Sequence, residues 1–262
     1  MLRNLRIYFI ATVLVLGLSA SALFAQIPEV ISMRDVGVKE GADTEMLEKM
    51  SKHGAKQLAE KSEGMFFALL MGNRGQRKGK YMHSYAFATK EQRDHYFPKE
   101  GADAPQHTQD LFNSISFPGD QNPNSFLEGG ELYTDYVILG YDQMEAPKGG
   151  AVVSIHLLEV AEGKEAEFEK MVTESIHPLW QKNIEGMYIY VLKGDRGARK
   201  GKYIQMMMFD SMERRDAYFP VEGEGFSEEL AKQITDELWP AKKFEALGMS
   251  SSGYTDYHFV SR

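Results

Sequence analysis

The sequence contains no cysteine, and after its first 25 residues it has no apolar run near the length of a membrane span. The absence of cysteine excludes disulfide bonds and also the lipidated cysteine of a bacterial lipoprotein. Positive charge is scarce, since 30 Lys and Arg face 38 Asp and Glu and the net charge is −8. Nucleic acid is therefore not an expected partner, because binding to phosphate backbones needs a basic surface.

Motifs of common reactions are missing as well. The sequence has no GxSxG nucleophile motif, no paired general-acid motif, no zinc signature and no P-loop ending. Its histidines form no HxxxH or HxH pair with supporting carboxylates. The sequence therefore predicts no metal site and leaves open whether the protein is an enzyme.

The first 25 residues have the layout of a secretory signal peptide. Two arginines, Arg3 and Arg6, precede an apolar run at 7–18 and small residues at 19–22. The run is shorter than the ~20 residues that span a bilayer, so cleavage after Ala22 or Ala25 is expected rather than retention as an anchor. Loss of the two arginines would take the net charge from −8 to −10. We expect a periplasmic or secreted protein without stable membrane insertion.

The rest of the chain contains an internal repeat. Residues 63–101 and 185–223 align without a gap and are identical at 21 of 39 positions. The match continues upstream, from 30 and 152, and downstream, where Tyr-Thr-Asp-Tyr stands at both 133–136 and 254–257. Two similar halves, 26–145 and 146–262, are therefore expected after the leader at 1–25.

The second copy predicts the order of elements most clearly. A strand at 152–160 leads into a helix at 165–183, whose apolar residues recur every three or four positions. Two apolar runs, 187–192 and 203–209, flank turn residues and predict a hairpin. Ser211 is expected to cap a short helix that Pro220 ends. A further helix at 227–246 and a last strand at 254–260 complete the order β-α-β-β-α-β.

This order, present twice, resembles the dimeric α+β barrel superfamily in a fused form. A ferredoxin-like βαββαβ unit covers only one face of its sheet with helices, and here the second copy offers a partner for the other face. The predicted fold class is α+β, with two tandem ferredoxin-like βαββαβ repeats forming a pseudo-dimeric α+β barrel. The superfamily includes antibiotic-biosynthesis-type monooxygenases, NIPSNAP-like proteins, haem-degrading monooxygenases and chlorite dismutase-like proteins. The resemblance implies a pocket but brings no catalytic motif with it.

Strand alternation suggests which side chains line that pocket, because successive residues point to opposite faces. One face of the predicted strands is markedly more polar than the other, and we expect it to face the barrel interior. The predicted ligand-binding residues are Arg34, His83, Tyr85, Tyr136, His156, Tyr188, Tyr190, Gln205 and Tyr257. The alternative is a barrel core in which the tyrosine hydroxyls simply find hydrogen-bond partners.

Positions at which the halves differ are expected to determine specificity. A duplicated scaffold keeps its fold through shared residues, whereas a single asymmetric pocket needs unlike counterparts. The unlike pairs are His83 and Gln205, His156 and Arg34, and Ala68 and Tyr190.

The best preserved string is a basic turn, RGQRKGKY at 74–81 and RGARKGKY at 196–203. Its glycines and cations suit an anion-binding nest. The favoured interpretation is structural, with Arg74 and Arg196 pairing with Asp94 and Asp216 inside or between the halves.

Three functions stay open. The first is an exported small-ligand-binding protein of the cell envelope with no catalytic motif. The second is a cofactor-independent monooxygenase-like enzyme, in which Tyr, His and Arg side chains position a substrate. The third is a haem-binding protein that uses one histidine. No cofactor is expected under the first two.

Overall fold

The computed structural model describes residues 27–118, 122–129, 132–141 and 150–261. The predicted leader and its cleavage positions lie outside these residues. Within the described ranges, none of the helices has the length and apolar character needed to cross a membrane.

The first half follows the predicted order of elements. Strand β1 leads into helix α2, which Asp43 caps by accepting a hydrogen bond from the Met46 N–H at 2.9 Å. The elements are β1 (Val30–Val38), α2 (Thr44–Lys61), β2 (Met65–Gly75), β3 (Tyr81–Phe87), α3 (Lys90–Tyr96), α4 (Gln106–Asn113), the 3₁₀ helix η3 (Pro123–Phe126), β4 (Leu127–Glu128) and β5 (Thr134–Ile138).

The second half repeats this order with different helix lengths. Its elements are β6 (Val152–Glu159), α5 (Glu165–Met171), the π-helical turn η5 (Val172–Ile176), α6 (His177–Asn183), β7 (Met187–Gly197), β8 (Tyr203–Phe209), α7 (Met212–Tyr218), α8 (Glu228–Gln233), α9 (Ala241–Ala246) and β9 (Ser250–Ser261). Ser211 caps α7 as predicted, accepting from the Arg214 N–H at 3.0 Å. The prediction of a single helix at 227–246 is wrong, because two helices occupy this range. Helix α8 ends at Gln233, and α9 begins directly after Pro240, a residue that cannot lie in the interior of a continuous helix.

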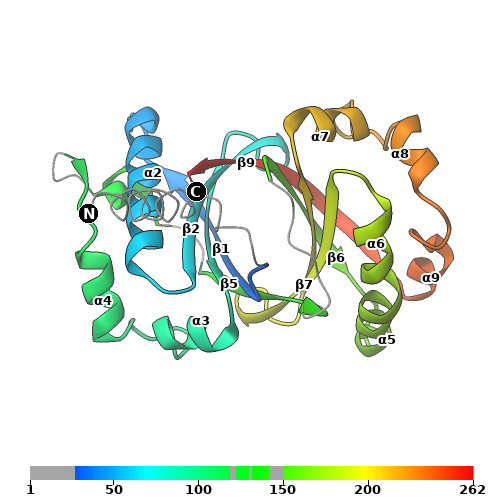
Figure 1. Cartoon of the computed structure of the whole chain (residues 1–262), viewed down its shortest axis with the longest axis horizontal. Helices are drawn as coiled ribbons and strands as arrows, with labels where there is room; N and C mark the ends of the chain where they lie inside the picture. Colours follow the sequence, from blue (N-terminus) through cyan, green and yellow to red (C-terminus); the bar gives the residue numbers. More distant parts are fainter. Residues whose placement is uncertain (1–26, 119–121, 130–131, 142–149, 262) are drawn as a thin grey trace, which may run out of the picture.

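Eight of the strands form a closed antiparallel barrel (Figure 1). The order around it is β1-β3-β2-β9-β6-β8-β7-β5, and β5 pairs with β1 to close the ring. Each half contributes a four-stranded ferredoxin-like sheet, and the seams between halves are β2–β9 and β5–β7. The predicted pseudo-dimeric barrel is thus confirmed. The two sheets also join edge to edge, which leaves none of these eight strands with an unpaired edge.

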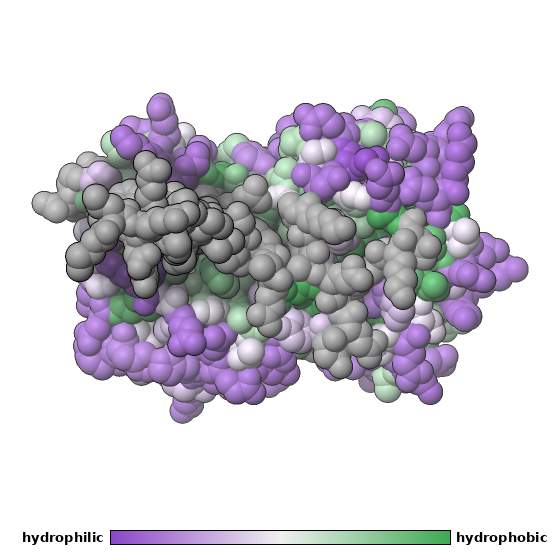
Figure 2. Space-filling model, viewed as in Figure 1, coloured by the Kyte–Doolittle hydropathy of each residue, from purple (hydrophilic) through white to green (hydrophobic). Residues whose placement is uncertain are grey.

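Apolar side chains fill both faces of the barrel wall. The interior cluster includes Ile31, Met82, Val153, Ile204 and Met208. Outside the wall, α2, α3 and α4 lie on one side of the barrel and α5 to α9 on the other (Figure 1). The helices bury their own clusters against the outer sheet face and present mainly hydrophilic residues outward (Figure 2).

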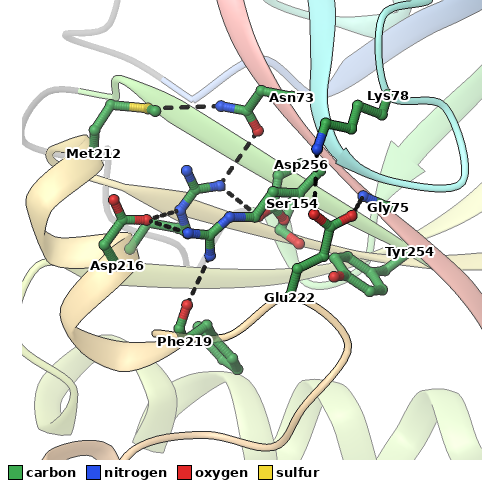
Figure 3. Close-up of polar contacts among 12 residues, drawn as sticks. Asn73, Gly75, Lys78, Ser154, Met212, Asp216, Phe219, Glu222, Tyr254 and Asp256 are labelled. Carbon is green, nitrogen blue, oxygen red and sulfur yellow. Dashed lines mark hydrogen bonds and ion pairs between the residues drawn. The ribbon is translucent and has the colours of Figure 1, made fainter.

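The repeated basic turn contacts the opposite half (Figure 3). Arg74 of the first half donates to Asp216 Oδ1 at 2.9 Å and to the Phe219 carbonyl oxygen at 2.7 Å. Arg196 makes the symmetric contacts, with Asp94 Oδ1 at 2.8 Å and a carbonyl oxygen of the first half at 2.9 Å. The predicted pairing of turn with helix is confirmed, and both pairs join one half to the other.

A second pair of arginines lies beneath these contacts, almost fully buried. Arg93 Nη1 is 3.0 Å from Asp135 Oδ2 and 2.9 Å from Asp195 Oδ2. Arg215 Nη1 is 2.5 Å from Asp256 Oδ2. A buried cation is tolerated only when paired. These pairs therefore attach α3 and α7 to strands at the two seams.

The glycine that follows each turn arginine is required by the backbone. Gly75 and Gly197 have φ of +83° and +90°, a left-handed conformation that other residues rarely adopt. A Cβ at either position would collide with a backbone carbonyl oxygen of the opposite half. The Gly75 N–H donates to Glu222 Oε1 at 2.8 Å, and the Gly197 N–H donates to Glu100 Oε1 at 2.9 Å. Many of the residues that are identical in the two repeats thus make contacts across the seams between the halves.

The helix predicted at 165–183 forms with a π-helical turn in its middle, directly before His177. The His177 side chain is buried, and its Nε2 accepts a hydrogen bond from the Val191 N–H at 3.0 Å. Burial lowers the pKa of His177 from 6.5 to about 4. The neutral ring therefore connects the helical layer to β7.

Replacing Arg196 with Ala should lower the free energy of unfolding by roughly 2 kcal/mol, because two hydrogen bonds of a charged group across the seam are lost. Urea denaturation and thermal melting measure the effect. Lys200→Ala, at an exposed position of the same turn, is the matched control and should melt like the parent. An unchanged melting curve for Arg196→Ala would contradict the structural role.

His177 should make the protein sensitive to mild acid. The pKa of His177 is lower in the folded protein than in the unfolded chain. Between pH 6.5 and about pH 4 the imidazole is therefore protonated in the unfolded chain but neutral in the folded protein. Stability is lost as the pH falls through this window, by up to about 3 kcal/mol at about 1.4 kcal/mol per pKa unit. His177→Gln should reduce this loss in urea titrations across the window. The control is His53→Gln on the exposed face of α2, and equal acid sensitivity in both variants would refute the assignment.

Candidate functional site

The barrel interior holds two adjacent cavities. The larger, here the apolar cavity, has a volume of about 320 Å³, and the smaller, the polar cavity, has about 280 Å³. Met33, Met82 and Ile155 line both. Along β1 the apolar cavity contacts Ile31 and Met33, whereas the polar cavity contacts Met33, Arg34 and Asp35, so the two follow one another along the barrel.

The apolar cavity is lined mainly by aliphatic, thioether and aromatic side chains. Its residues are Ile27, Pro28, Ile31, Met33, Gly64, Phe66, Phe67, Ala68, Leu70, Met82, Ser84, Ala86, Ala88, Gln92, Ile138, Val153, Ile155, Tyr190, Met206, Met208 and Phe259. Among the described residues, no Asp, Glu, His, Lys or Arg contributes to this lining. Such a surface suits an uncharged molecule.

Unlike counterparts of the two repeats shape this cavity. On the first-half side the lining includes Ala68, Ser84 and Ala86. The counterparts of these residues are Tyr190, Met206 and Met208, which line the same cavity from the second half. The cavity therefore lies where the first half has small residues. At the equivalent positions of the second half, larger side chains occupy the corresponding space.

Charged and phenolic groups converge in the polar cavity. The Arg77 Nε lies 2.9 Å from Asp35 Oδ1, and the Arg77 cation is close enough to Tyr257 to act on its pKa. Burial and the nearby Asp35 raise the pKa of Tyr257 to about 12. Burial raises the pKa of Tyr136, and the nearby Arg199 cation opposes this rise. These tyrosines are neutral hydrogen-bonding groups at neutral pH.

Five of the predicted site residues line a cavity or pack against the interior cluster. Arg34, Tyr136 and Tyr257 line the polar cavity, and Tyr190 lines the apolar one. Tyr188 packs against the interior cluster.

The other four predicted residues line neither cavity, so their placement inside the barrel needs correction. They are His83, Tyr85, His156 and Gln205. In β3 the interior is contacted by Met82, Ser84 and Ala86, which turns the residues between them toward the helices. Alternation separates two sets of side chains but does not say which set faces inward. In the closed barrel the apolar set faces the interior, and the role of these four residues in ligand binding stays a prediction.

The outward residues form two separate groups. In the first half, Arg34 Nη2 lies 3.4 Å from His83 Nδ1, and the Arg34 guanidinium lies 4.6 Å from the ring centre of Tyr133. Burial and the neighbouring Arg34 lower the pKa of His83 to about 4. In the second half, His156 Nε2 lies 3.1 Å from a serine hydroxyl, and the imidazole stacks on Tyr254 at 5.5 Å. Most polar atoms of each group find partners within it, but the buried Arg34 Nε has no hydrogen-bond partner among the described residues.

The described residues do not fit a histidine-ligated haem. No histidine lines either barrel cavity in the described part of the chain. The Nε2 atoms of His177 and His156 already have hydrogen-bond partners. Across the described ranges, no group of three His, Asp or Glu side chains is arranged to hold a metal ion.

Sequence reasoning missed most of the apolar lining and three charged residues of the polar cavity: Asp35, Arg77 and Arg199. A search for polar groups cannot find an apolar cavity. The unlike pair Ala68 and Tyr190 was a usable signal, and Ser84 with Met206 and Ala86 with Met208 are of the same kind. The charged residues also had a usable signal in the sequence. Both turns contain the arginine, at 77 and 199, but the position equivalent to Asp35 in the second half is Leu157.

No protein-family model matches the sequence, and no curated protein sequence is significantly similar to it. Solved structures resemble it in shape. A proposed monooxygenase from Lactobacillus acidophilus aligns over 88% of this chain and 94% of its own, with 10% identity and a TM-score of 0.54. A proposed monooxygenase from Fusobacterium nucleatum aligns over 90% and 94%, with 10% identity and a TM-score of 0.52. A proposed chlorite dismutase aligns over 89% and 95%, with 7% identity and a TM-score of 0.50. At these identities the likeness concerns the fold alone, and the chain has the fold of the dimeric α+β barrel superfamily, with both halves of the barrel on one polypeptide.

Proposed function

We propose that this protein binds a small, mainly apolar molecule inside the barrel. The observation that carries the proposal is the apolar cavity of about 320 Å³ within a closed wall of hydrogen-bonded strands. Ligand sites of proteins are typically concave, mainly apolar and largely preformed, and this cavity has those properties.

Packing energetics support a binding role. Protein interiors are close-packed, and empty space in them costs stability because the lining atoms lose contacts. A bound apolar molecule restores those contacts and gains about 25 cal/mol for each Å² of its surface removed from water. Small residues at Ala68, Ser84 and Ala86 keep the space open, although larger counterparts fit the equivalent backbone of the second half.

Binding is favoured over oxygenation by the chemistry of the lining. An oxygenase without a cofactor needs a group that takes a proton from the substrate, and such a base must lie within hydrogen-bond reach of it. Among the described residues, the apolar cavity offers no carboxylate and no imidazole for this step. The fold neighbours include proposed monooxygenases, but the similarity is too distant to bring a reaction to this chain.

Filling the cavity should abolish binding. Ser84→Met and Ala86→Met copy the second-half residues Met206 and Met208, so each new side chain suits the strand that carries it. The probe is N-phenyl-1-naphthylamine, an uncharged dye whose fluorescence rises in apolar surroundings. We expect the parent to bind the dye and each variant to bind it at least about tenfold more weakly, a loss of about 1.4 kcal/mol.

The matched control is His83→Gln, which copies Gln205 on the opposite face of the same strand. It should bind the dye like the parent. Weakened binding in this control together with normal binding in Ala86→Met would move the site to the outward face around His83. A parent that takes up no dye would overturn the proposal.

Export to the periplasm or the medium is part of the proposal and rests on the sequence of the first 25 residues alone. N-terminal sequencing of the protein from its native host should give a chain that starts at Leu23 or Gln26. A chain that retains Met1 in a membrane fraction would contradict it.

A further inference from the structure

Two arginines stand at symmetric places in the polar cavity. Arg77 and Arg199 occupy the same position of the repeated turn, and both line the cavity. Each reaches a tyrosine of the opposite half, Arg77 to Tyr257 and Arg199 to Tyr136. Each also donates its backbone N–H to a threonine of the opposite half. The backbone thus fixes both side chains at the same depth in the barrel.

The symmetry ends at the counter-ion. Arg77 has Asp35 at 2.9 Å, but the residue equivalent to Asp35 in the second half is Leu157, which also lines the cavity. In the described part of the chain, no carboxylate lies within ion-pair distance of Arg199. The Nε atoms of Arg77 and Arg199 are both buried without a hydrogen-bond partner, but only that of Arg77 has a carboxylate oxygen among these residues at 2.9 Å. Of the two symmetric guanidiniums, one is thus paired with a carboxylate and the other is not, while Arg34, which also lines the cavity, lies against His83 and Tyr133.

A guanidinium in this position is prepared for an anion. Withdrawing an arginine from water is unfavourable unless a counter-charge and hydrogen-bond acceptors replace the solvent. The planar fork of guanidinium donors matches the two oxygens of a carboxylate. Asp35 supplies a carboxylate oxygen to Arg77 at 2.9 Å, and the carboxylate of a ligand can take the same role at Arg199.

The neighbouring apolar cavity suggests what the anion is attached to. Of the described residues, Met33, Met82 and Ile155 alone line both cavities, and unbranched methionine side chains adjust readily to a guest. A molecule with a charged head and an apolar tail therefore matches the interior better than a small inorganic ion.

We infer that Arg199 binds the carboxylate of an amphiphilic organic acid, whose apolar tail extends past Met33 and Met82 into the apolar cavity. This inference rests on the proposed function, because the tail occupies the cavity assigned there. It adds a head-group preference that the apolar cavity alone does not produce.

The test compares decanoate with decan-1-ol, which have the same chain length and differ in the head group. Both are titrated below micellar concentrations at neutral pH against protein loaded with N-phenyl-1-naphthylamine. The parent should bind decanoate at least about tenfold more tightly than decan-1-ol. Leu157→Asp places a carboxylate opposite Arg199, as Asp35 stands opposite Arg77, and should remove this preference by weakening decanoate binding more than decan-1-ol binding.

Leu157→Asn is the control, since it has the shape of the Asp variant without the charge, and it should keep the preference for decanoate. Arg199→Gln gives an independent reading if Leu157→Asp does not fold, and it should also lose the preference. Equal binding of both probes by the parent would overturn the inference and leave the proposed function standing. A preference that survives Leu157→Asp and Arg199→Gln would exclude Arg199 as the binding group. Failure of the dye and both probes to bind would refute the proposed function as well.

Discussion

Reciprocal contacts between an arginine of one half and a helix of the other hold the barrel closed. Arg74 and Arg196 each bind a carboxylate and a backbone carbonyl oxygen across a seam. The buried pairs of Arg93 and Arg215 lie beneath them. Two ferredoxin-like sheets have four exposed edges between them, and the seams β2–β9 and β5–β7 remove all four. The cavities exist only because this wall is closed.

In this duplicated chain, the residues shared by the two halves and the residues that differ have separate roles. The shared residues gather at the seams, where the glycines have a backbone conformation and a close approach that a side chain would disturb. The unlike residues shape the interior. Ala68, Ser84 and Ala86 face Tyr190, Met206 and Met208 across the apolar cavity. A twofold repeat thereby encloses a site without twofold symmetry.

The charged residues of the polar cavity also combine a shared position with an unlike one. Arg77 and Arg199 occupy the same position of turns that support the seams, yet among the described residues only Arg77 has a carboxylate beside it. One substitution, Leu157 at the position equivalent to Asp35, separates a satisfied ion pair from a potential anion site. Burial makes this difference matter, because an exposed guanidinium would be solvated by water.

The sequence by itself determined the repeat, the βαββαβ order, the cap at Ser211 and the pairing of the basic turns with acidic residues. These follow from local periodicity, from turn chemistry and from 21 identities in 39 positions. Only the tertiary structure decided which face of each strand became the interior. Alternation defines two faces, but closure of the wall chose between them and turned Met82 inward and His83 outward. The break between α8 and α9 was also readable, since Pro240 marks it. The place of Arg199 opposite Leu157 was not readable, because it depends on contacts between residues far apart in the chain.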